Sequence, residues 1–247
     1  MAKKILAALV LTASLANADR VLVNNDEWTF TDYGFSAAAG TAQFAVNVAD
    51  WLTAGSAGNN ILVLSQNFGL VGSALNTTLT GAGYNVTLNT SGASTVANMG
   101  DYDAIYVAGN PVNNAALINY VNNGGNVYIA AGTGWGGAAQ EAANWNTFLN
   151  AYGMAYGEYY NGACCSLTPP NTHPIFDGVS SVYFNNGNNA IDLIAGGSSQ
   201  MLWSNGSIGL IAAYDGNAPA AVPEPGTMAL MGLGLGAIAF GYRRRKN

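Results

Sequence analysis

The chain has 247 residues, of which 50% are hydrophobic and only 8% are charged, whereas roughly 25% are charged in an ordinary soluble protein. Its basic residues lie almost entirely at the two ends. Between residues 19 and 222, Arg20 is the only base against twelve acidic residues, which gives this segment a net charge of −11. Phosphate binding depends on clustered Lys and Arg, so this distribution excludes a nucleic-acid partner.

Residues 1–18 have the three parts of a secretory signal peptide. Two lysines precede an apolar run over residues 5–15, and Ala16 and Ala18 form an A-x-A cleavage site. We therefore expect signal peptidase to cleave here, so that the mature chain starts at Asp19. The alternative is an uncleaved membrane anchor, but the apolar run is shorter than the roughly 20 residues that span a bilayer.

The C-terminal segment also has three parts. The triplet Pro223-Glu224-Pro225 is followed by an uncharged stretch over residues 226–242 and by four basic residues at 243–246. A helix of this length covers about 25 Å, enough for a thin hydrocarbon core. Basic residues that flank a membrane span stay in the cytoplasm. The segment therefore predicts a short transmembrane helix that transiently anchors a precursor in the inner membrane.

Residues 222–247 resemble the PEP-CTERM sorting signal of Gram-negative bacteria, which has the same triplet, apolar helix and basic cluster in this order. The resemblance implies recognition by an exosortase and cleavage near the triplet. It further implies release or attachment at the cell surface or in the extracellular matrix, in bacteria that make exopolysaccharide and biofilm. The alternative is a plain C-terminal anchor.

Between these ends, residues 19–221 predict a single α/β domain. Strands that are apolar throughout alternate with amphipathic helices, which predicts a mostly parallel sheet covered on both faces. The predicted strands are 20–24, 61–65, 84–88, 103–108 and 127–130, and the predicted helices are 41–53, 71–80, 113–123 and 137–152. Short strands at 183–184, 190–194, 201–203 and 208–214 predict an antiparallel C-terminal extension of the sheet.

Two segments resemble the class I glutamine amidotransferase-like superfamily and its trehalose-utilisation-like relatives. Residues 173–179 read His-Pro-Ile-Phe-Asp-Gly-Val, and residues 130–137 read Ala-Ala-Gly-Thr-Gly-Trp-Gly-Gly after a strand, where these enzymes carry their nucleophile. The resemblance implies a flavodoxin-like three-layer sandwich. The enzymes need a Cys at this turn, activated by a nearby His. This chain has Thr133 there, and its single histidine, His173, is expected to be structural. We therefore expect no catalysis.

Cys164 and Cys165 are adjacent and are the only cysteines. An exported protein meets an oxidising compartment. Three outcomes stay open for this pair: a disulfide between the two neighbours, two free thiols, or a bridge between chains.

Polar and acidic residues follow several of the predicted parallel strands. Parallel strands end at one edge of a sheet, and ligands bind in the crevice there. The candidate crevice residues are Asn24, Asp26, Glu27, Asn67, Asn110, Thr133, Trp135 and Glu141. The alternative is that they are ordinary loop residues and helix caps.

This crevice favours a neutral glycan or Ca²⁺ as its ligand. Trp135 offers a flat apolar face for a sugar ring, and amide and carboxylate oxygens can accept bonds from hydroxyls or hold Ca²⁺. The candidate Ca²⁺ ligands are Asp26 and Glu27. With no lysine nearby, clustered carboxylates repel one another unless one is protonated or a cation lies between them. No other cofactor is expected.

The sequence therefore predicts a non-catalytic, exported cell-surface or extracellular-matrix protein, associated with exopolysaccharide. Two alternatives stay open. One is a divergent hydrolase that acts through paired carboxylates such as Asp26, Glu27 or Glu141. The other is a self-assembling matrix protein whose edge strands after residue 180 pair between chains.

Overall fold

The computed structural model describes residues 19–217, apart from 55, 57, 67–68, 93–97, 110–112, 133–135 and 187–188. The predicted signal peptide and the predicted C-terminal helix lie outside the described residues. The chain divides into two units, one that ends at Gly216 and one that begins at Asn217. All of the described helices and strands belong to the first unit.

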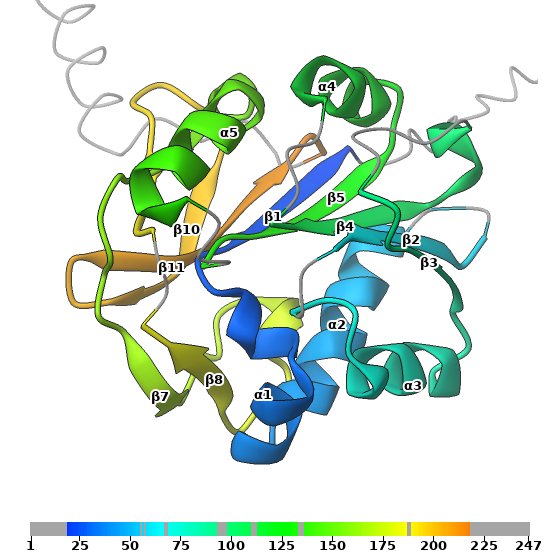
Figure 1. Cartoon of the computed structure of the whole chain (residues 1–247), viewed down its shortest axis with the longest axis horizontal. Helices are drawn as coiled ribbons and strands as arrows, with labels where there is room; N and C mark the ends of the chain where they lie inside the picture. The colour runs from blue at the N-terminus through cyan, green and yellow to red at the C-terminus, as the bar shows by residue number, and fades with distance from the viewer. Residues whose placement is uncertain are drawn as a thin grey trace, which may run out of the picture. The chain divides into compact units, whose positions relative to one another are not determined.

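A seven-stranded sheet forms the centre of this unit (Figure 1), in the order β10-β11-β1-β5-β4-β2-β3. The five strands from β1 to β3 in this order are parallel, and β11 and β10 are antiparallel additions beside β1. Their bounds are β1 Arg20–Asn24, β2 Asn60–Ser65, β3 Asn85–Asn89, β4 Ala104–Ala108, β5 Asn126–Ala130, β10 Gln200–Asn205 and β11 Ile208–Asp215.

Helices cover both faces of the sheet, so the unit has three layers (Figure 1). The helices are α1 Asp32–Ala37, α2 Thr41–Thr53, α3 Ser73–Gly81, α4 Asn114–Asn122 and α5 Gly137–Ala151, with short 3-10 helices η1 Glu27–Phe30, η2 Met99–Asp101 and η3 Pro174–Phe176. Helices α2 and α3 pack on one face of the sheet, and α4 and α5 pack on the other. The predicted mixed α/β class with a mostly parallel sheet is confirmed.

The apolar strands follow from this double cover. Leu22 and Tyr128 enter the core beneath α2, whereas Val21 and Val23 enter the core beneath α5. Successive side chains of a strand point to opposite faces, so a strand covered on both faces must be apolar at every position. All five residues of β5 are accordingly buried.

The predicted antiparallel extension is only partly correct. Strands β10 and β11 extend the sheet, but β8 (Val182–Asn185) pairs with β7 (Cys164–Leu167), and β9 (Ile191–Leu193) pairs with β6 (Met154–Tyr156). The last two pairs are separate two-stranded sheets. Alternation in a sequence identifies a strand but not its partner. Phe184 of β8 instead packs on Trp203 of β10, with ring centroids 5.1 Å apart, in the core beneath α2.

The chain leaves two neighbouring strands in opposite directions. After β1 it passes to α2 on one face of the sheet, and after β5 it passes to α5 on the other face. Strands β1 and β5 are adjacent and parallel, with Asn24 opposite Ala130 at their carboxyl ends. Such a switch point is where open α/β sheets form a crevice.

Candidate functional site

The carboxyl ends of β1 and β5 bring three acidic side chains together. Asp26 and Glu27 follow β1, and Glu141 lies in the second turn of α5. Asp26 and Glu27 are 0% exposed and Glu141 is 2% exposed. Of the predicted crevice residues, Asn24 joins this cluster, whereas Asn67, Asn110, Thr133 and Trp135 lie outside the described residues.

Asp26 connects two distant segments of the chain. Its Oδ1 accepts a hydrogen bond from the backbone N–H of Trp28 (2.9 Å), which caps η1. Its Oδ2 accepts one from the backbone N–H of Asn185 at the end of β8 (2.5 Å). Hydrogen bonds to a carboxylate are stronger than those between neutral groups, so Asp26 holds β8 against the end of β1.

Glu141 binds the loop that follows β5. Its Oε2 accepts the backbone N–H of Gly132 (2.9 Å). Gly132 has φ +87°, and a Cβ built there would lie 3.1 Å from the Cα of Asp26. This turn therefore needs glycine, both for its left-handed backbone and for its closeness to the strand end beside it.

Glu27 is held by its backbone but not by its side chain. Its N–H donates to the carbonyl of Ala131 (2.6 Å), while neither carboxyl oxygen has a hydrogen-bond partner among the described residues. The loop after β2 closes on the side chain, because a Cβ built on Gly69 would lie 2.8 Å from three of its carbon atoms.

The surroundings of Glu27 strongly favour its neutral form. Burial, followed by the negative charges of Glu141 and Asp26, raises its pKa to about 9 from a usual value of 4.5. The Glu27 side chain is thus a protonated carboxylic acid at neutral pH. Protonation is one of the two ways in which clustered carboxylates relieve their repulsion.

Two tyrosine hydroxyls form hydrogen bonds with Asn24 at the end of β1. The Asn24 amide Nδ2 donates to the hydroxyl of Tyr128 (3.0 Å), and its Oδ1 accepts the N–H of Asp26 (3.1 Å). The hydroxyl of Tyr156 donates to the Asn24 carbonyl (3.0 Å). Sequence reasoning missed both tyrosines. Tyr128 stands out as a polar group inside an apolar strand, but nothing near Tyr156 predicted its strand.

Two observations bear on metal binding in the part of the chain that is described. There, no group of three or more His, Cys, Asp or Glu side chains could hold a metal ion. Both oxygens of Asp26 already accept backbone N–H groups, which Ca²⁺ would have to displace. Ca²⁺ binding at Asp26 and Glu27 stays a prediction.

His173 lies at the opposite edge of the sheet, beside the start of β1. Its Nδ1 accepts the backbone N–H of Ile175 (3.4 Å), which caps η3, and its ring meets Trp51 edge to face at 5.4 Å. Burial lowers the pKa of His173. The Trp51 carbonyl in turn accepts a hydrogen bond from Arg20, the first residue of β1 (2.6 Å), so the imidazole is a strand's length from Glu27.

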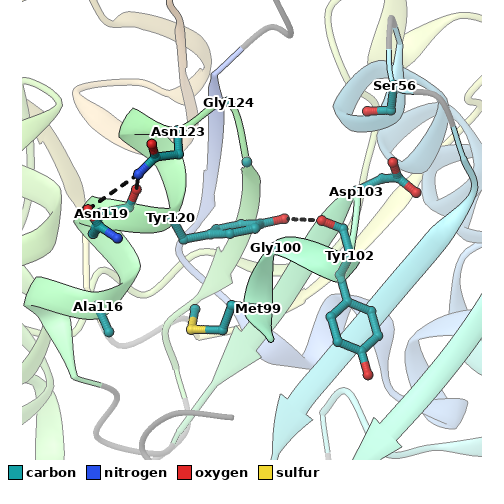
Figure 2. Close-up of a pocket in the computed structure, with 11 residues that line it drawn as sticks. Ser56, Met99, Gly100, Tyr102, Asp103, Ala116, Asn119, Tyr120, Asn123 and Gly124 are labelled. Atoms are coloured by element: carbon teal, nitrogen blue, oxygen red, sulfur yellow. Dashed lines mark hydrogen bonds between the residues drawn. The ribbon is translucent and has the colours of Figure 1, made fainter. Parts of the chain in front are cut away.

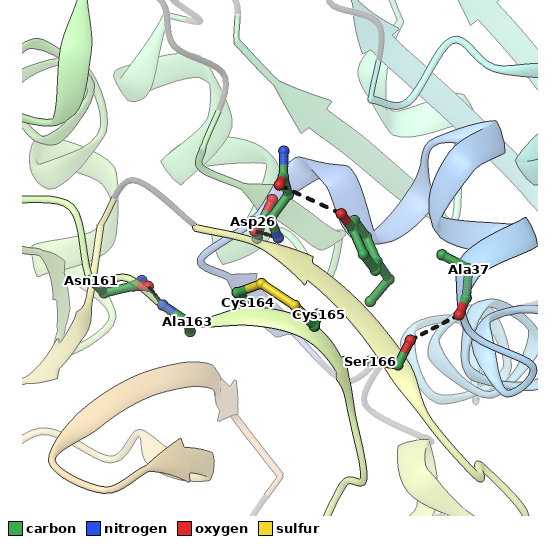
Figure 3. Close-up of a disulfide and its surroundings, with 9 residues drawn as sticks. Asp26, Ala37, Asn161, Ala163, Cys164, Cys165 and Ser166 are labelled. Carbon is green, nitrogen blue, oxygen red and sulfur yellow. Dashed lines mark hydrogen bonds between the residues drawn. A yellow bond between two sulfur atoms is a disulfide. The ribbon is translucent and has the colours of Figure 1, made fainter.

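Cys164 and Cys165 form a disulfide with each other at the start of β7 (Figure 3). Both residues are exposed, and Cys165 has a left-handed backbone with φ 77°. Asn185, the partner of Cys164 in the hairpin, donates the backbone N–H that Asp26 accepts. Asn185 therefore links the disulfide to the buried carboxylates.

A separate pocket of about 430 Å³ lies near the amino ends of β4 and β5 (Figure 2). Tyr120 crosses it and donates its hydroxyl to the carbonyl of Tyr102 (2.8 Å). Other side chains that line the pocket come from Ser56, Met99, Asp103, Ala116, Asn119 and Asn123. It lies at the sheet edge opposite Glu27, and no sequence motif indicated it.

Comparison with known families identifies the C-terminal segment. Residues 221–246 match the family model described as the PEP-CTERM protein-sorting motif. The chain is therefore an exosortase substrate, exported by way of a membrane-anchored precursor. No helix in the described part of residues 19–217 is long and apolar enough to cross a membrane, and the predicted span at 226–242 lies outside that part.

The α/β unit has no such counterpart. No curated protein and no solved structure matches the chain. The resemblance to class I glutamine amidotransferases thus depends on residues 130–137 and 173–179 and on the sheet itself.

Proposed function

We propose that this chain is a non-catalytic protein of the cell surface or extracellular matrix that associates with exopolysaccharide after exosortase sorting. The observation that carries the proposal is the PEP-CTERM motif at residues 221–246, because it directs the α/β unit out of the cell. A net charge of −11 over residues 19–222 further favours a neutral partner over an anionic one.

The chemistry of the strand-end cluster supports a structural role. Asp26 and Glu141 accept backbone N–H groups from Asn185 and Gly132 and so hold loops in place. Glu27 is buried and neutral, and His173 lies at the other edge of the sheet. A general base needs to reach a proton on the substrate, and these side chains face the interior.

We further propose that the unit is a divergent relative of the class I glutamine amidotransferases. Its five parallel strands have the spatial order β3-β2-β4-β5-β1. This order corresponds to the flavodoxin-like order 2-1-3-4-5 only when the count starts at β2, because β1, the first strand of the chain, lies where the fifth strand of such a sheet would be. The Gly132 turn after β5 has the tight left-handed backbone expected where the enzymes carry their nucleophile.

The test is to express the full chain in an exosortase-bearing Gram-negative bacterium and to follow both processing and location. Intact-mass analysis of the surface fraction is expected to show a start at Asp19 and loss of most residues after about 225. A variant with Pro223, Glu224 and Pro225 all replaced by Ala is expected to keep its tail and to stay with the inner membrane.

Association is measured on the same material. The processed protein is expected to sediment with the exopolysaccharide of that host, and treatment that degrades the polysaccharide is expected to release it. If the protein is free of polysaccharide both before and after this treatment, the association is refuted.

A carboxylate hydrolase is the second candidate, and one observation favours it. Glu27 is neutral beside the two carboxylates of Asp26 and Glu141, and acid–base pairs in glycosidases have unlike protonation of this kind. Glycan hydrolysis by the purified chain that is lost in Glu27→Gln and in Glu141→Gln would establish it. Under the first proposal all three proteins are inactive.

Self-assembly is the third candidate. Strand β3 forms one edge of the sheet and exposes Leu88 (47%), which offers a place for pairing between chains. Concentration-dependent oligomers that Leu88→Lys abolishes would favour it.

A further inference from the structure

The β7–β8 hairpin has one buried face and one outer face. Val182 and Phe184 of β8 are fully buried, whereas Tyr183 and Asn185 beside them are half-buried. Register pairs Cys164 with Asn185 and Ser166 with Tyr183, so these four residues share the outer face.

Two aromatic rings of other elements extend this outer face. The ring of Tyr33 on α1 is 56% exposed and meets the ring of Tyr183 edge to face at 5.1 Å. The ring of Trp28 on η1 meets that of Tyr33 edge to face, with centroids 6.3 Å apart. We call the outer face of the hairpin together with Tyr33 and Trp28 the tyrosine platform.

The platform is held rigidly to the core. Thr29 donates its hydroxyl to the carbonyl of Tyr183 (2.9 Å), and Ser166 donates its hydroxyl to the carbonyl of Ala37 (2.8 Å). Asp26 accepts the N–H of Asn185, and the disulfide fixes the start of β7 (Figure 3). An exposed surface that is ordered in advance loses little conformational entropy when it binds a partner.

Two more exposed aromatic side chains lie close to the disulfide in the sequence. Tyr159 and Tyr160 are 58% and 56% exposed and precede Cys164 by five and four residues. Five residues span at most about 18 Å, so both rings lie within the reach of one polymer chain from the disulfide.

We propose that the tyrosine platform binds a neutral polysaccharide, by stacking tyrosine rings and the exposed disulfide residues beside them on the apolar faces of sugar rings. This inference rests on the proposed association with exopolysaccharide and assigns it to a surface. Tyrosine offers an apolar ring and a hydroxyl that can bond to sugar hydroxyls, and polarisable sulfur also packs well on apolar surface.

The net charge of the unit favours a neutral polysaccharide over an anionic one. The segment from residue 19 to 222 carries −11, and Arg20, its only base, lies at the opposite edge of the sheet. An anionic polysaccharide would be repelled by this charge, and a second copy of the chain is distinguished by the test below. A neutral glycan meets no such repulsion.

The test compares variants of the full chain by affinity electrophoresis in gels that contain the neutral or the anionic exopolysaccharide fraction of the exporting bacterium. We expect the neutral fraction to retard the unaltered chain and Tyr33→Ala to weaken that binding roughly three- to tenfold, as expected for loss of one aromatic contact. Tyr33→Phe keeps the ring and is expected to stay within about twofold.

Leu88→Ala is the matched control. Leu88 is similarly exposed, but it lies on β3, the outermost strand on the side of the sheet away from β10. Thermal unfolding of each variant checks that the fold is intact. If the unaltered chain binds neither fraction, the proposed association is wrong. If it binds but Tyr33→Ala and Cys164→Ser/Cys165→Ser bind equally well, or if only the anionic fraction binds, the platform is wrong while the association stands. Retardation without polysaccharide that rises with protein concentration would instead identify a second copy as the occupant.

Discussion

Replacement of Glu27 by Gln should stabilise the protein, and the gain should grow with pH. Glutamine has the shape of the protonated acid but needs no proton. Folding of the unaltered chain must keep a proton on Glu27, whose pKa rises from 4.5 to about 9 in the folded state. Folding therefore takes up a proton between these two values, and the stability due to this group is complete below pH 4.5 and falls as pH rises to 9.

The slope is about 1.4 kcal/mol per pH unit, so the expected gain of Glu27→Gln is close to zero at pH 4 and about 3 kcal/mol at pH 7. The gain is measured by urea unfolding at a series of pH values, as the difference in the free energy of unfolding between the variant and the unaltered chain. The titration of all other groups cancels in this difference. Glu158→Gln, at an exposed site, is the control and should change stability by less than about 0.5 kcal/mol throughout. A difference that stays constant between pH 5 and 8, or a glutamine variant that is less stable at pH 8, would refute the protonated state of Glu27.

Three further results are expected. Gly132→Ala should cost about 2 kcal/mol or more in urea unfolding, because alanine disfavours φ +87° and its Cβ meets the Asp26 backbone, whereas Gly81→Ala, with open space around it, should be neutral or stabilising. Arg20→Met should cost about 1–3 kcal/mol in the same assay, since it removes an ion pair of 3.1 Å and a hydrogen bond of 2.6 Å to the Trp51 carbonyl near the end of α2. Maleimide should label neither cysteine before reduction. After mild reduction without denaturant it should label both Cys164 and Cys165, because the two residues are exposed. Labelling of the untreated protein would contradict the disulfide.

Local patterns predicted most of the parallel half of the fold. The helix predicted at 41–53 matches α2 residue for residue, and the strand predicted at 20–24 matches β1. These segments carry clear periodicity because a strand covered on both faces, or a helix with one apolar face, constrains every position. The strand pairing of the C-terminal part could not be predicted in the same way. β6 has only three residues, and the partners of β8 and β9 depend on contacts with distant segments such as that of Phe184 with Trp203.

For the residues at the strand ends, too, the sequence did not reveal what depends on contacts with distant segments. The rule that parallel strands end at one edge of a sheet singled out Asp26, Glu27 and Glu141, which the structure places at the carboxyl ends of β1 and β5. The predicted crevice as a whole stays a prediction, since Asn67, Asn110, Thr133 and Trp135 lie outside the described residues. The sequence could not reveal that all three are buried, because their burial depends on the Gly69 loop closing over Glu27 and on β8 reaching Asp26. Tyr33 and Tyr183 drew no attention in the sequence, since exposed tyrosines acquire meaning only when distant elements place them side by side.

The pairing of β1 with β11 brings the two ends of the unit together. β11 runs antiparallel to β1 and ends at Asp215, directly opposite Arg20, so the first and last strands meet at one pole of the sheet. Asp26, Glu27 and the tyrosine platform lie at the other pole, beyond the carboxyl end of β1. The chain leaves this unit after Gly216, at the pole away from the platform. Arg20, the only base between residues 19 and 222, pairs with Asp215 at 3.1 Å, so its ion pair closes the β1–β11 ladder at the place where the chain enters and leaves the unit.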